Sequence, residues 1–387
     1  MPSADCDHAI RDALRHGRAL LKFISANDAG ATGSHQCGFY LPIALWQLYT
    51  PQPPVDAINH KHIVNISWPD NRVTESAVTW YGKGTRHEYR LTRFGRDFPY
   101  LNSEVVGSLL VLIPITAQVF SAFVLHEDDD ILEVQTTLGI EVHDTWGIYG
   151  HNEEQSETED ECFSRYFREF CASADEFPTV AEFSNTTREA LLTCIDAYRS
   201  MPEDARLTRA IETEYSLFRR FERAFCAPQI EQPFNTIDEF LKTAASIMNR
   251  RKARAGRSFE NHVEFLLKDE GIPFEAQPAI DGRPDIVIPS AAAYHNSSIP
   301  EEAVFVVGLK TTCKDRWRQV LNEGTRVKRK HLITLQRGIS ANQLAEMHQA
   351  GVSLIVPKPF HRDYPRDSPM HLHTVGTFVE EVRRTLA

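Results

Sequence analysis

Residues 283–290 read RPDIVIPS, and residues 303–324 read AVFVVGLKTTCKDRWRQVLNEG. Each segment contains a short apolar run that is typical of a buried strand. Asp285 heads the first run, Lys310 ends the second, and Glu323 follows thirteen residues after the lysine. The two segments therefore predict neighbouring strands of an α/β sheet whose ends carry two carboxylates and a lysine.

Two carboxylates and a lysine at strand ends are typical of metal-assisted hydrolysis of phosphodiesters. Carboxylate oxygens bind a hard divalent cation, and the cation polarises the phosphoryl group and supplies hydroxide near neutral pH. The lysine can orient the attacking water and offset the charge that grows on the phosphate oxygens. We therefore treat Asp285, Lys310 and Glu323 as a candidate catalytic site for cutting DNA.

Each of these residues also has an ordinary structural explanation. A Pro-Asp pair is common in turns, a lysine at a strand end is usually a solvated charge, and Glu323 could lie on a helix surface. Trp317 and Val320 nevertheless predict that the helix buries one face. Glu323 lies three residues after Val320, beside that face, where an unpaired carboxylate would be costly. A bound metal ion would remove this cost.

The composition predicts a soluble, globular chain of about two domains. The 387 residues are 42% hydrophobic and 25% charged. The longest apolar stretch, residues 105–124, is too interrupted by polar residues, Gly107 and Pro114 for a membrane helix. The N-terminus has no signal-peptide core. Seven scattered cysteines without CxxC spacing predict free thiols in a reduced cytoplasm and argue against a zinc site.

The net charge of −11 is concentrated in the middle of the chain. Residues 1–126 carry 11 basic and 10 acidic side chains, residues 127–200 carry 4 and 19, and residues 201–387 carry 27 and 24. The flanking regions are therefore free to present basic faces to phosphates. A further hypothesis is that the acidic segment mimics DNA and holds a binding cleft closed.

Two kinds of pattern divide the chain. Residues 17–145 contain short alternating runs between turn signals, which predict a β-rich, barrel-like domain. Its expected strands include HIVNISW (62–68), SAVTWYG (76–82), HEYRLTRF (87–94), SLLVLIPI (108–115) and ILEVQTTL (131–138). The polar, acidic residues 151–161 predict an exposed linker. Helical patterns follow, and the last third alternates strand and helix, with Ser258 and Ser340 expected to cap helices.

Lys314, Asp315 and Arg316 lie at the start of the helix expected after Lys310. A helix N-terminus that carries Lys and Arg can enter the major groove, where these side chains hydrogen-bond guanine. Asp315 is an acceptor for the amino group of cytosine. The triplet is therefore a candidate reader of C·G pairs, although an exposed helix face with ion pairs would have the same composition.

The quoted segments, together with ISANQLAEMHQAGVSLIVP (339–357), resemble the C-terminal catalytic domain of EcoRII-type restriction endonucleases. These belong to the CCGG-related branch of the PD-(D/E)xK nucleases, in which the second acid has moved from the lysine strand to the following helix. Gly308 stands where that acid would be. The resemblance implies Mg²⁺ as cofactor and assigns roles to seven residues: Asp285 and Glu323 as metal ligands, Lys310 as catalytic lysine, Glu260 as a further acid, and Lys314, Asp315 and Arg316 as base readers.

Residues 22–42, KFISANDAGATGSHQCGFYLP, resemble the effector-DNA-binding domain of the same enzymes, a pseudobarrel of the plant B3 type. The resemblance implies effector-DNA contacts at four positions: His35, Tyr40, Arg93 and Arg96. A polar turn cluster and solvated strand-end charges are the ordinary alternatives. The expected architecture is a two-domain α+β chain: residues 1–155 form the B3-like domain, 156–178 an acidic hinge, and 179–387 a restriction-endonuclease-like α/β domain.

We therefore expect a homodimeric, Mg²⁺-dependent type II restriction endonuclease that cuts double-stranded DNA at an unmethylated CCWGG-like site. A dimer presents two identical centres to the two strands of a palindrome. The resemblance also implies an effector copy of the site, a cognate methyltransferase, and an N-terminal domain that obstructs the cleft when empty. Two alternatives stay open: a catalytically inactive B3-like DNA-binding protein, and a metal-dependent hydrolase of another substrate.

Tyr294 and the basic residues 250–257 are two further candidates for a functional role. Tyr294 could be a nucleophile that forms a covalent phosphotyrosine, but the metal site already accounts for water activation, so Tyr294 is expected to pack near the site. The basic cluster at residues 250–257 is expected to face phosphates or solvent. The central base pair, the cut position and the residue that stacks a flipped base are not defined by these patterns.

Overall fold

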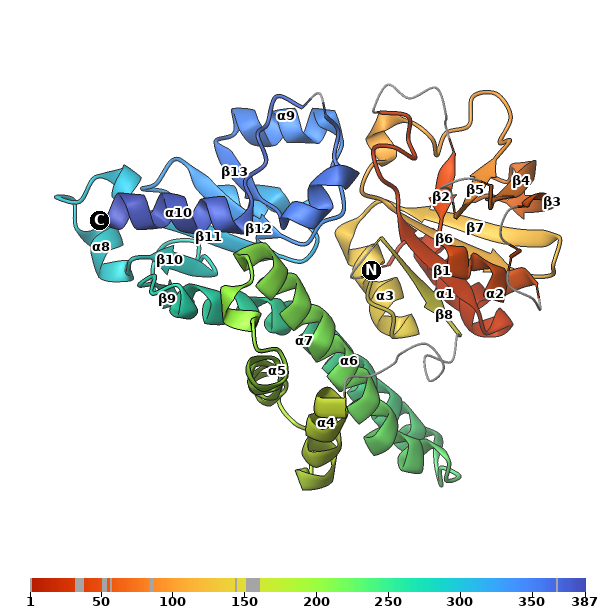
Figure 1. Cartoon of the computed structure of the whole chain (residues 1–387), viewed down its shortest axis with the longest axis horizontal. Helices are drawn as coiled ribbons and strands as arrows, with labels where there is room; N and C mark the ends of the chain where they lie inside the picture. The colour runs from red at the N-terminus through yellow and green to blue at the C-terminus, as the bar shows by residue number, and fades with distance from the viewer. Residues whose placement is uncertain are drawn as a thin grey trace.

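The computed structural model describes residues 2–31, 38–50, 54–55, 58–83, 87–142, 145–150, 161–366 and 368–387. In Figure 1 the N-terminal domain, red to yellow, lies beside the C-terminal domain, cyan to blue. Long green helices run below both domains. This is the two-domain α+β architecture that the sequence predicts.

The N-terminal domain is built on one large sheet. Its elements are α1 (Ala4–His16), β1 (Ala19–Phe23), β2 (Phe39–Leu41), α2 (Trp46–Tyr49), β3 (Asn59–Ser67), β4 (Val73–Tyr81), β5 (Glu88–Thr92), β6 (Leu109–Pro114), β7 (Val119–Leu125), α3 (Asp128–Leu138) and β8 (Trp146–Tyr149). The strand order is β2-β5-β4-β3-β7-β6-β1-β8, and only the β3–β7 pair is parallel among the described strands.

Alternation along these strands gives the sheet two buried faces. On β1, Leu20 belongs to a core cluster with the aromatic residues of β2, β4 and β5, whereas Leu21 faces α1 and α3. Both faces are therefore covered, which explains why all five residues of β1 are buried.

The segment ILEVQTTL was wrongly predicted as a strand, because it forms most of α3. Its buried residues Ile131, Val134 and Leu138 follow the helical spacing of three and four. Three aspartates occupy the first turn, where they interact favourably with the helix dipole, and Gly139 ends the helix with φ +64°. The strand of this region is β7, which lies just before α3.

The C-terminal domain contains a smaller, mixed sheet. Its elements are α4 (Glu161–Ser173), α5 (Val180–Cys194), α6 (Glu203–Ile230), α7 (Ile237–Asp269), β9 (Glu275–Ala276), β10 (Ile286–Ile288), α8 (Ala291–His295), β11 (Phe305–Lys310), β12 (Lys330–Thr334), α9 (Ala341–Gln349), β13 (Val352–Ile355) and α10 (Val375–Leu386). The order is β13-β12-β11-β10-β9, with β11, β12 and β13 parallel and β10 antiparallel to both its neighbours.

Helices cover both faces of this sheet. Residues of α6, α7 and α10 pack on one face, around Phe259 and Phe378. The other face holds α9 and a 3₁₀ helix, Arg316–Asn322. Ser340 caps α9 as predicted, with its hydroxyl accepting from the amide of Gln343. Ser258 caps no helix, because α7 runs unbroken through it.

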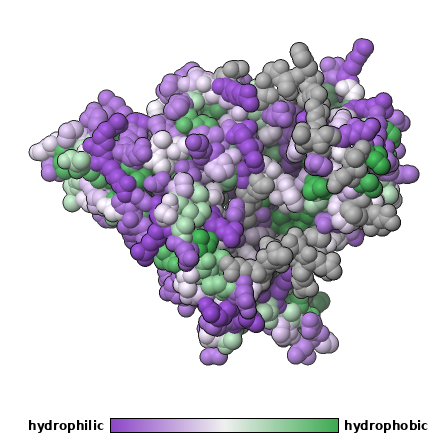
Figure 2. Space-filling view, viewed as in Figure 1, coloured by the Kyte–Doolittle hydropathy of each residue, from purple (hydrophilic) through white to green (hydrophobic). Residues whose placement is uncertain are grey.

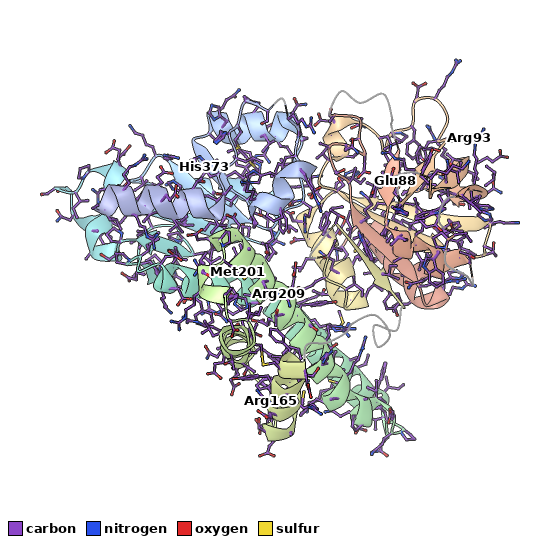
Figure 3. All side chains as sticks on the ribbon, viewed as in Figure 1. Glu88, Arg93, Arg165, Met201, Arg209 and His373 are labelled. Atoms are coloured by element: carbon purple, nitrogen blue, oxygen red, sulfur yellow. A yellow bond between two sulfur atoms is a disulfide. The ribbon has the colours of Figure 1, made fainter. Side chains whose placement is uncertain are left out.

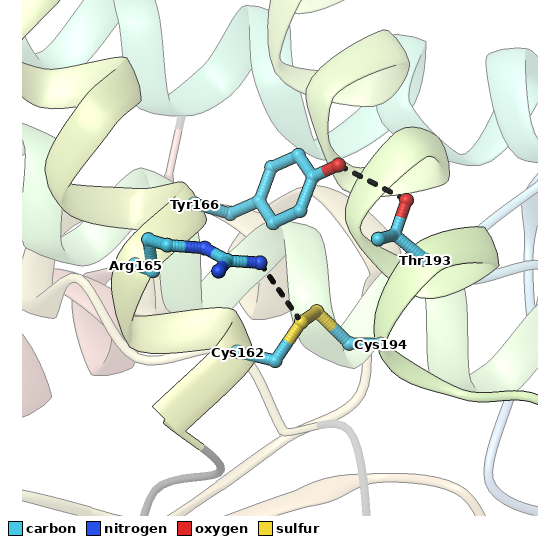
Figure 4. The surroundings of a disulfide bond; sticks show 5 residues. All are labelled: Cys162, Arg165, Tyr166, Thr193 and Cys194. Atoms are coloured by element: carbon cyan, nitrogen blue, oxygen red, sulfur yellow. Dashed lines mark hydrogen bonds between the residues drawn. A yellow bond between two sulfur atoms is a disulfide. The ribbon is translucent and has the colours of Figure 1, made fainter.

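The helices α4 to α6 form a separate aromatic layer. Phe163 and Phe167 of α4 are buried in it, so the hinge proposed at residues 156–178 includes a packed helix. Cys162 and Cys194 form a disulfide that joins the start of α4 to the end of α5 (Figure 4). The expectation of free thiols was therefore wrong for these two, since their pairing depends on a tertiary contact that spacing does not reveal.

Part of the basic cluster of α7 makes contacts inside the protein. Arg254 is 1% exposed and forms ion pairs with Glu141 and Glu214. Arg251 pairs with Glu222 and also donates to two carbonyl oxygens at the end of α3. These contacts fasten α7 to the N-terminal domain, so Arg251 and Arg254 do not face solvent, whereas Lys252 and Arg257 are exposed as expected.

The visible surface in Figure 2 is mainly hydrophilic, with apolar side chains in small separate groups. Among the described residues, no helix combines the length and the apolar character needed to cross a membrane.

Candidate active site and its interface with the N-terminal domain

The pairing of β10 and β11 brings Asp285 beside Lys310. Ile286 lies opposite Val307 in this antiparallel pair, so Asp285 lies near the end of β11. Its Oδ2 accepts hydrogen bonds from the Leu309 amide at 2.6 Å and from Lys310 Nζ at 2.8 Å. The structure therefore joins the first two predicted site residues directly.

Glu323 reaches the same region because Gly308 has no side chain. The 3₁₀ helix Arg316–Asn322 packs on β11 through Val320, and a Cβ on Gly308 would lie 2.5 Å from Val320 Cγ1. Glu323 directly follows this helix instead of lying within it. The strand position that lacks an acid is thus the position that lets Glu323 approach.

The surroundings of Glu323 are unusual for a carboxylate. Its Oε2 is buried and makes no hydrogen bond to any residue that the structure describes. Burial raises the pKa of Glu323 to about 7, Lys310 lowers it, and Asp285 raises it. Val320 packs on Gly308, next to the Leu309 amide that donates to Asp285, and Glu323 follows three residues after Val320, so Glu323 lies in the same region as Asp285 and Lys310.

The donor set fits a hard divalent cation. One oxygen of Glu323 is buried and has no hydrogen-bond partner among the described residues, and Asp285 supplies a second carboxylate in the same region. Within the described ranges, no group of three or more His, Cys, Asp and Glu side chains could hold a metal. Glu260 pairs with Arg257 on α7 and is not part of such a group, so its role stays a prediction.

Tyr294 packs near the site as expected. Tyr294 is 4% exposed, and its hydroxyl donates to Asp281 Oδ1 at 2.5 Å. The Tyr294 hydroxyl oxygen also accepts from the Arg326 amide. Burial raises its pKa. A buried hydroxyl with these two partners is unsuited to attack phosphorus.

The N-terminal domain contacts all three residues of the candidate base-reading triplet. Lys314 Nζ donates to Ser108 Oγ at 2.7 Å. Asp315 and Asp128 exchange hydrogen bonds, each backbone amide donating to the other carboxylate at 3.1 Å. The Arg316 amide also donates to Asp128 Oδ2. The triplet lies at the start of the 3₁₀ helix, and it faces the N-terminal domain in this arrangement.

Burial shifts the pKa values of two charged side chains at this contact, Asp128 and Lys314. Burial, together with the neighbouring Asp315, raises the pKa of Asp128 to about 7. Burial also lowers the pKa of Lys314 to about 8. Asp128 Oδ1 has no hydrogen-bond partner among the described residues. Sequence patterns missed Asp128, for which the acidic run at residues 127–130 was the one available signal.

Comparison with known proteins identifies the family. A model described as "EcoRII C terminal" matches residues 218–379, and one described as "Restriction endonuclease EcoRII, N-terminal" matches residues 15–146. The type II restriction enzyme EcoRII of Escherichia coli is 32% identical over 94% of this chain and 93% of its own length. The chain belongs to the EcoRII family of type II restriction enzymes. The predicted family and the predicted class, a site-specific deoxyribonuclease, are confirmed.

The chain is also similar to other restriction enzymes, at lower identity. The type II restriction enzyme SsoII of Shigella sonnei is 27% identical over 33% of this chain and 43% of its own length. The structure titled "Metal-depleted Ecl18kI in complex with uncleaved, modified DNA" has a TM-score of 0.45 and 17% identity, covering 58% of this chain and 84% of that one. The PspGI–substrate DNA complex has a TM-score of 0.44 and 13% identity, covering 54% and 93%.

The predicted effector-DNA residues of this EcoRII-family enzyme lie in the N-terminal domain. Tyr40 on β2 is 40% exposed, and the Arg90 guanidinium lies 5.8 Å from its ring centre. Arg93 and Arg96 are exposed after β5, and Arg93 lies on the side away from the C-terminal domain in Figure 3. His35 lies outside the described residues.

The turn before Tyr40 is organised by a buried carboxylate that sequence patterns missed. Asp28 is fully buried, forms an ion pair with Lys22, and accepts from the Ser25 amide at 2.9 Å. Its other oxygen accepts from the Tyr40 amide at 2.6 Å. Asp28 therefore fixes the start of β2 and, with it, the place of Tyr40 on the surface.

Proposed function

We propose that this EcoRII-family enzyme hydrolyses double-stranded DNA at a CCWGG-like site, with Mg²⁺ held by Asp285 and Glu323. The observation that carries the proposal is the buried oxygen of Glu323, which has no hydrogen-bond partner in the described part of the chain and lies in the region of Asp285 and Lys310. A bound Mg²⁺ would supply Lewis-acid stabilisation of the phosphate and a nucleophilic water near neutral pH.

The chain's own residues position the reactants. Asp285 fixes Lys310 through one of the three Nζ hydrogens, which leaves two to donate to the attacking water and to a phosphate oxygen. The positive charge of Lys310 stabilises the charge that develops on the phosphate. In-line attack of water on phosphorus would leave a 5′-phosphate on the product.

Lys314, Asp315 and Arg316 would recognise the DNA bases, since they supply hydrogen-bond donors for guanine and an acceptor for cytosine. A homodimer would place one catalytic centre on each strand of the palindrome. A cognate methyltransferase would protect the host's own sites, since an unmethylated site is the expected substrate.

The N-terminal domain is proposed to restrain the enzyme until effector DNA binds. Its contacts with Lys314, Asp315 and Arg316 support this, because residues that face Ser108 and Asp128 are not free to contact bases. Effector DNA bound at His35, Tyr40, Arg93 and Arg96 would favour the released arrangement, which is an allosteric coupling between two DNA sites.

The test is cleavage of a plasmid with several CCWGG sites, in Mg²⁺, with an added duplex that carries one site. We expect discrete fragments, which run-off sequencing would assign to one sequence and one cut position. Intact plasmid together with tight duplex binding would instead support the catalytically inactive DNA-binding alternative. Intact plasmid without salt-dependent duplex binding would support a hydrolase of another substrate.

A further inference from the structure

The loop that follows Glu323 is held by one carboxylate, that of Asp281. Its Oδ1 accepts from the Tyr294 hydroxyl at 2.5 Å, and its Oδ2 accepts from the backbone amide and the hydroxyl of Thr325, both at 2.7 Å. The carbonyl oxygen of Asp281 also accepts from the Gly324 amide at 2.8 Å. Asp281 therefore fixes the two residues that come directly after Glu323.

The turn that carries Asp281 also packs against Glu323 itself. Gly282 has φ +74°, and a Cβ on it would lie 2.5 Å from Glu323 Cα. Any side chain at this position would push the turn away from Glu323. The same turn leads into Asp285, so one short segment sets the positions of both candidate metal ligands.

The loop is held from its far side as well. The Tyr294 hydroxyl accepts from the Arg326 amide at 3.1 Å. Lys330, on β12, is 3% exposed and donates to the carbonyl oxygens of Gly324 at 2.6 Å and Val327 at 2.5 Å. The backbone after Glu323 is thus fixed between the turn at Asp281 and the strand β12.

We propose that Asp281 is a positioning residue that sets the spacing of Asp285 and Glu323 for a divalent cation. This inference rests on the proposed role of those two residues as metal ligands. The Tyr294 hydroxyl and the Thr325 amide hold the pKa of Asp281 at about 2, so it is ionised at neutral pH. An ionised acceptor binds its donors more strongly than a neutral one. Residues that orient metal ligands typically change metal affinity ~10–100-fold when replaced.

The test compares the wild type with Asp281→Asn and Tyr294→Phe. In Asp281→Asn, the amide nitrogen would replace an oxygen and lose hydrogen bonds. We expect the Mg²⁺ concentration for half-maximal cleavage to rise ~10-fold or more. The Mn²⁺ affinity of the DNA complex, measured by electron paramagnetic resonance, should fall by the same factor. Tyr294→Phe removes one bond to Asp281 and should shift both quantities less, in the same direction.

Glu302→Gln is the matched control, because Glu302 is exposed and its replacement removes one negative charge of the same domain. It should leave Mg²⁺ dependence and Mn²⁺ affinity at wild-type values. In EDTA, all variants should bind DNA with wild-type affinity. Wild-type Mn²⁺ affinity in Asp281→Asn, or an equal shift in Glu302→Gln, would overturn the positioning role.

A different set of results would contradict the proposed nuclease function. A wild-type protein that binds Mn²⁺ and DNA but leaves the DNA intact contradicts the nuclease, while the Mn²⁺ comparison of the variants still decides the role of Asp281. If Asp281→Asn does not fold, Tyr294→Phe decides the inference by the same two measurements. An unchanged Mn²⁺ affinity in folded Tyr294→Phe would then overturn it.

Discussion

Gly308 shows how the absence of a side chain shapes the candidate active site. It occupies the position on β11 where an acid would complete the usual motif, and it faces Val320 of the 3₁₀ helix. With no Cβ in the way, the helix lies directly on the strand and Glu323 enters the site from its end. The displaced acid and the glycine are therefore two parts of one arrangement.

This arrangement predicts a large effect of Gly308→Ala. The new Cβ would lie 2.5 Å from Val320 Cγ1, so the 3₁₀ helix must shift and carry Glu323 with it. We expect a loss of about 1–3 kcal/mol in the free energy of unfolding, and a fall in the cleavage rate at saturating DNA. Thermal unfolding and single-turnover cleavage would measure the two effects.

Gly256→Ala is the matched control. Gly256 lies within α7 with no heavy atom within 4 Å of its added Cβ, and alanine is the better helix former by about 1 kcal/mol. We expect equal or greater stability with unchanged cleavage. If Gly308→Ala behaved in the same way, close packing of Val320 on β11 would not matter for Glu323.

At the scale of residues, charged side chains at strand ends could be predicted from the sequence. Side chains whose partners lie far away in the chain could not. Asp285, Lys310 and Glu323 could be predicted because strand runs and the buried face of the next segment locate them. Asp281 and Asp128 could not, because Asp281 contacts Tyr294 and Thr325, 13 and 44 positions away, and Asp128 contacts Asp315, 187 positions away. No local pattern records such contacts.

Among the elements, the first turn of α3 and the 3₁₀ helix form the contact with the clearest dependence on pH. Asp128 lies opposite Asp315, with Lys314, Arg316, Asp129 and His126 around the pair. In this contact the pKa of Asp128 is about 7, against an ordinary value of 3.8. At a pH between these two values, the Asp128 carboxyl is protonated while the domains are in contact, and it loses the proton when the contact opens. Raising the pH towards 7 therefore favours release, and the effect levels off above it.

Asp128→Asn isolates this contribution, because the amide cannot titrate while His126 and Lys314 remain in both proteins. The ratio of the opening constants, wild type over variant, should rise with pH by up to ~10-fold per unit and become constant above about 7. Energy transfer between dyes on the two domains would report opening. A ratio that does not change with pH would contradict a retained proton on Asp128.

The elements themselves were mostly predictable from hydrophobic spacing. The strands around Asp285 and Lys310 and the cap at Ser340 agree with the structure. The segment ILEVQTTL was predicted wrongly, because the spacing of its apolar residues fits both a strand and a helix. The acidic first turn before it and Gly139 after it are the features that indicate a helix. Ser258 was misread as a cap because capping residues also occur inside long helices that tertiary packing stabilises.

At the scale of the whole molecule, backbone packing between two glycines helps to hold the domains together. Gly107 has φ +80°, and a Cβ on it would overlap the carbonyl oxygen of Gly338. Gln336 Nε2 donates to the Gly107 carbonyl oxygen at 3.1 Å beside this contact. A side chain at Gly107 would separate the domains without touching Asp285, Lys310 or Glu323.

Gly107→Ala should therefore weaken the restraint by the N-terminal domain. A clash of about 1–3 kcal/mol would raise cleavage of DNA with a single site roughly 10-fold and reduce its dependence on effector duplex. Gly17→Ala is the control, since Gly17 has φ +69° with open space around it and tests backbone strain alone. If both variants required effector as the wild type does, the glycine contact would not restrain the enzyme.

The domain order and the function class followed from sequence, and the family resemblance implied that the N-terminal domain obstructs the cleft, but the residues that form the contact did not follow. The net charge of residues 127–200 suggested an acidic closing segment, and Asp128 of this segment contacts the candidate base-reading triplet together with Ser108, which lies outside it. The net charge of a segment averages over many residues, whereas a contact between domains depends on which single residue lies at the interface.

We propose that Asp285, Lys310 and Glu323 together make this enzyme a metal-dependent endonuclease. The most direct measurement compares wild type and Lys310→Ala for single-turnover cleavage of a CCWGG duplex, in Mg²⁺ with effector, and for binding of the same duplex. We predict that Lys310→Ala cleaves at least ~100-fold more slowly while its DNA affinity stays within a few-fold of wild type. Cleavage by Lys310→Ala at the wild-type rate would contradict the account.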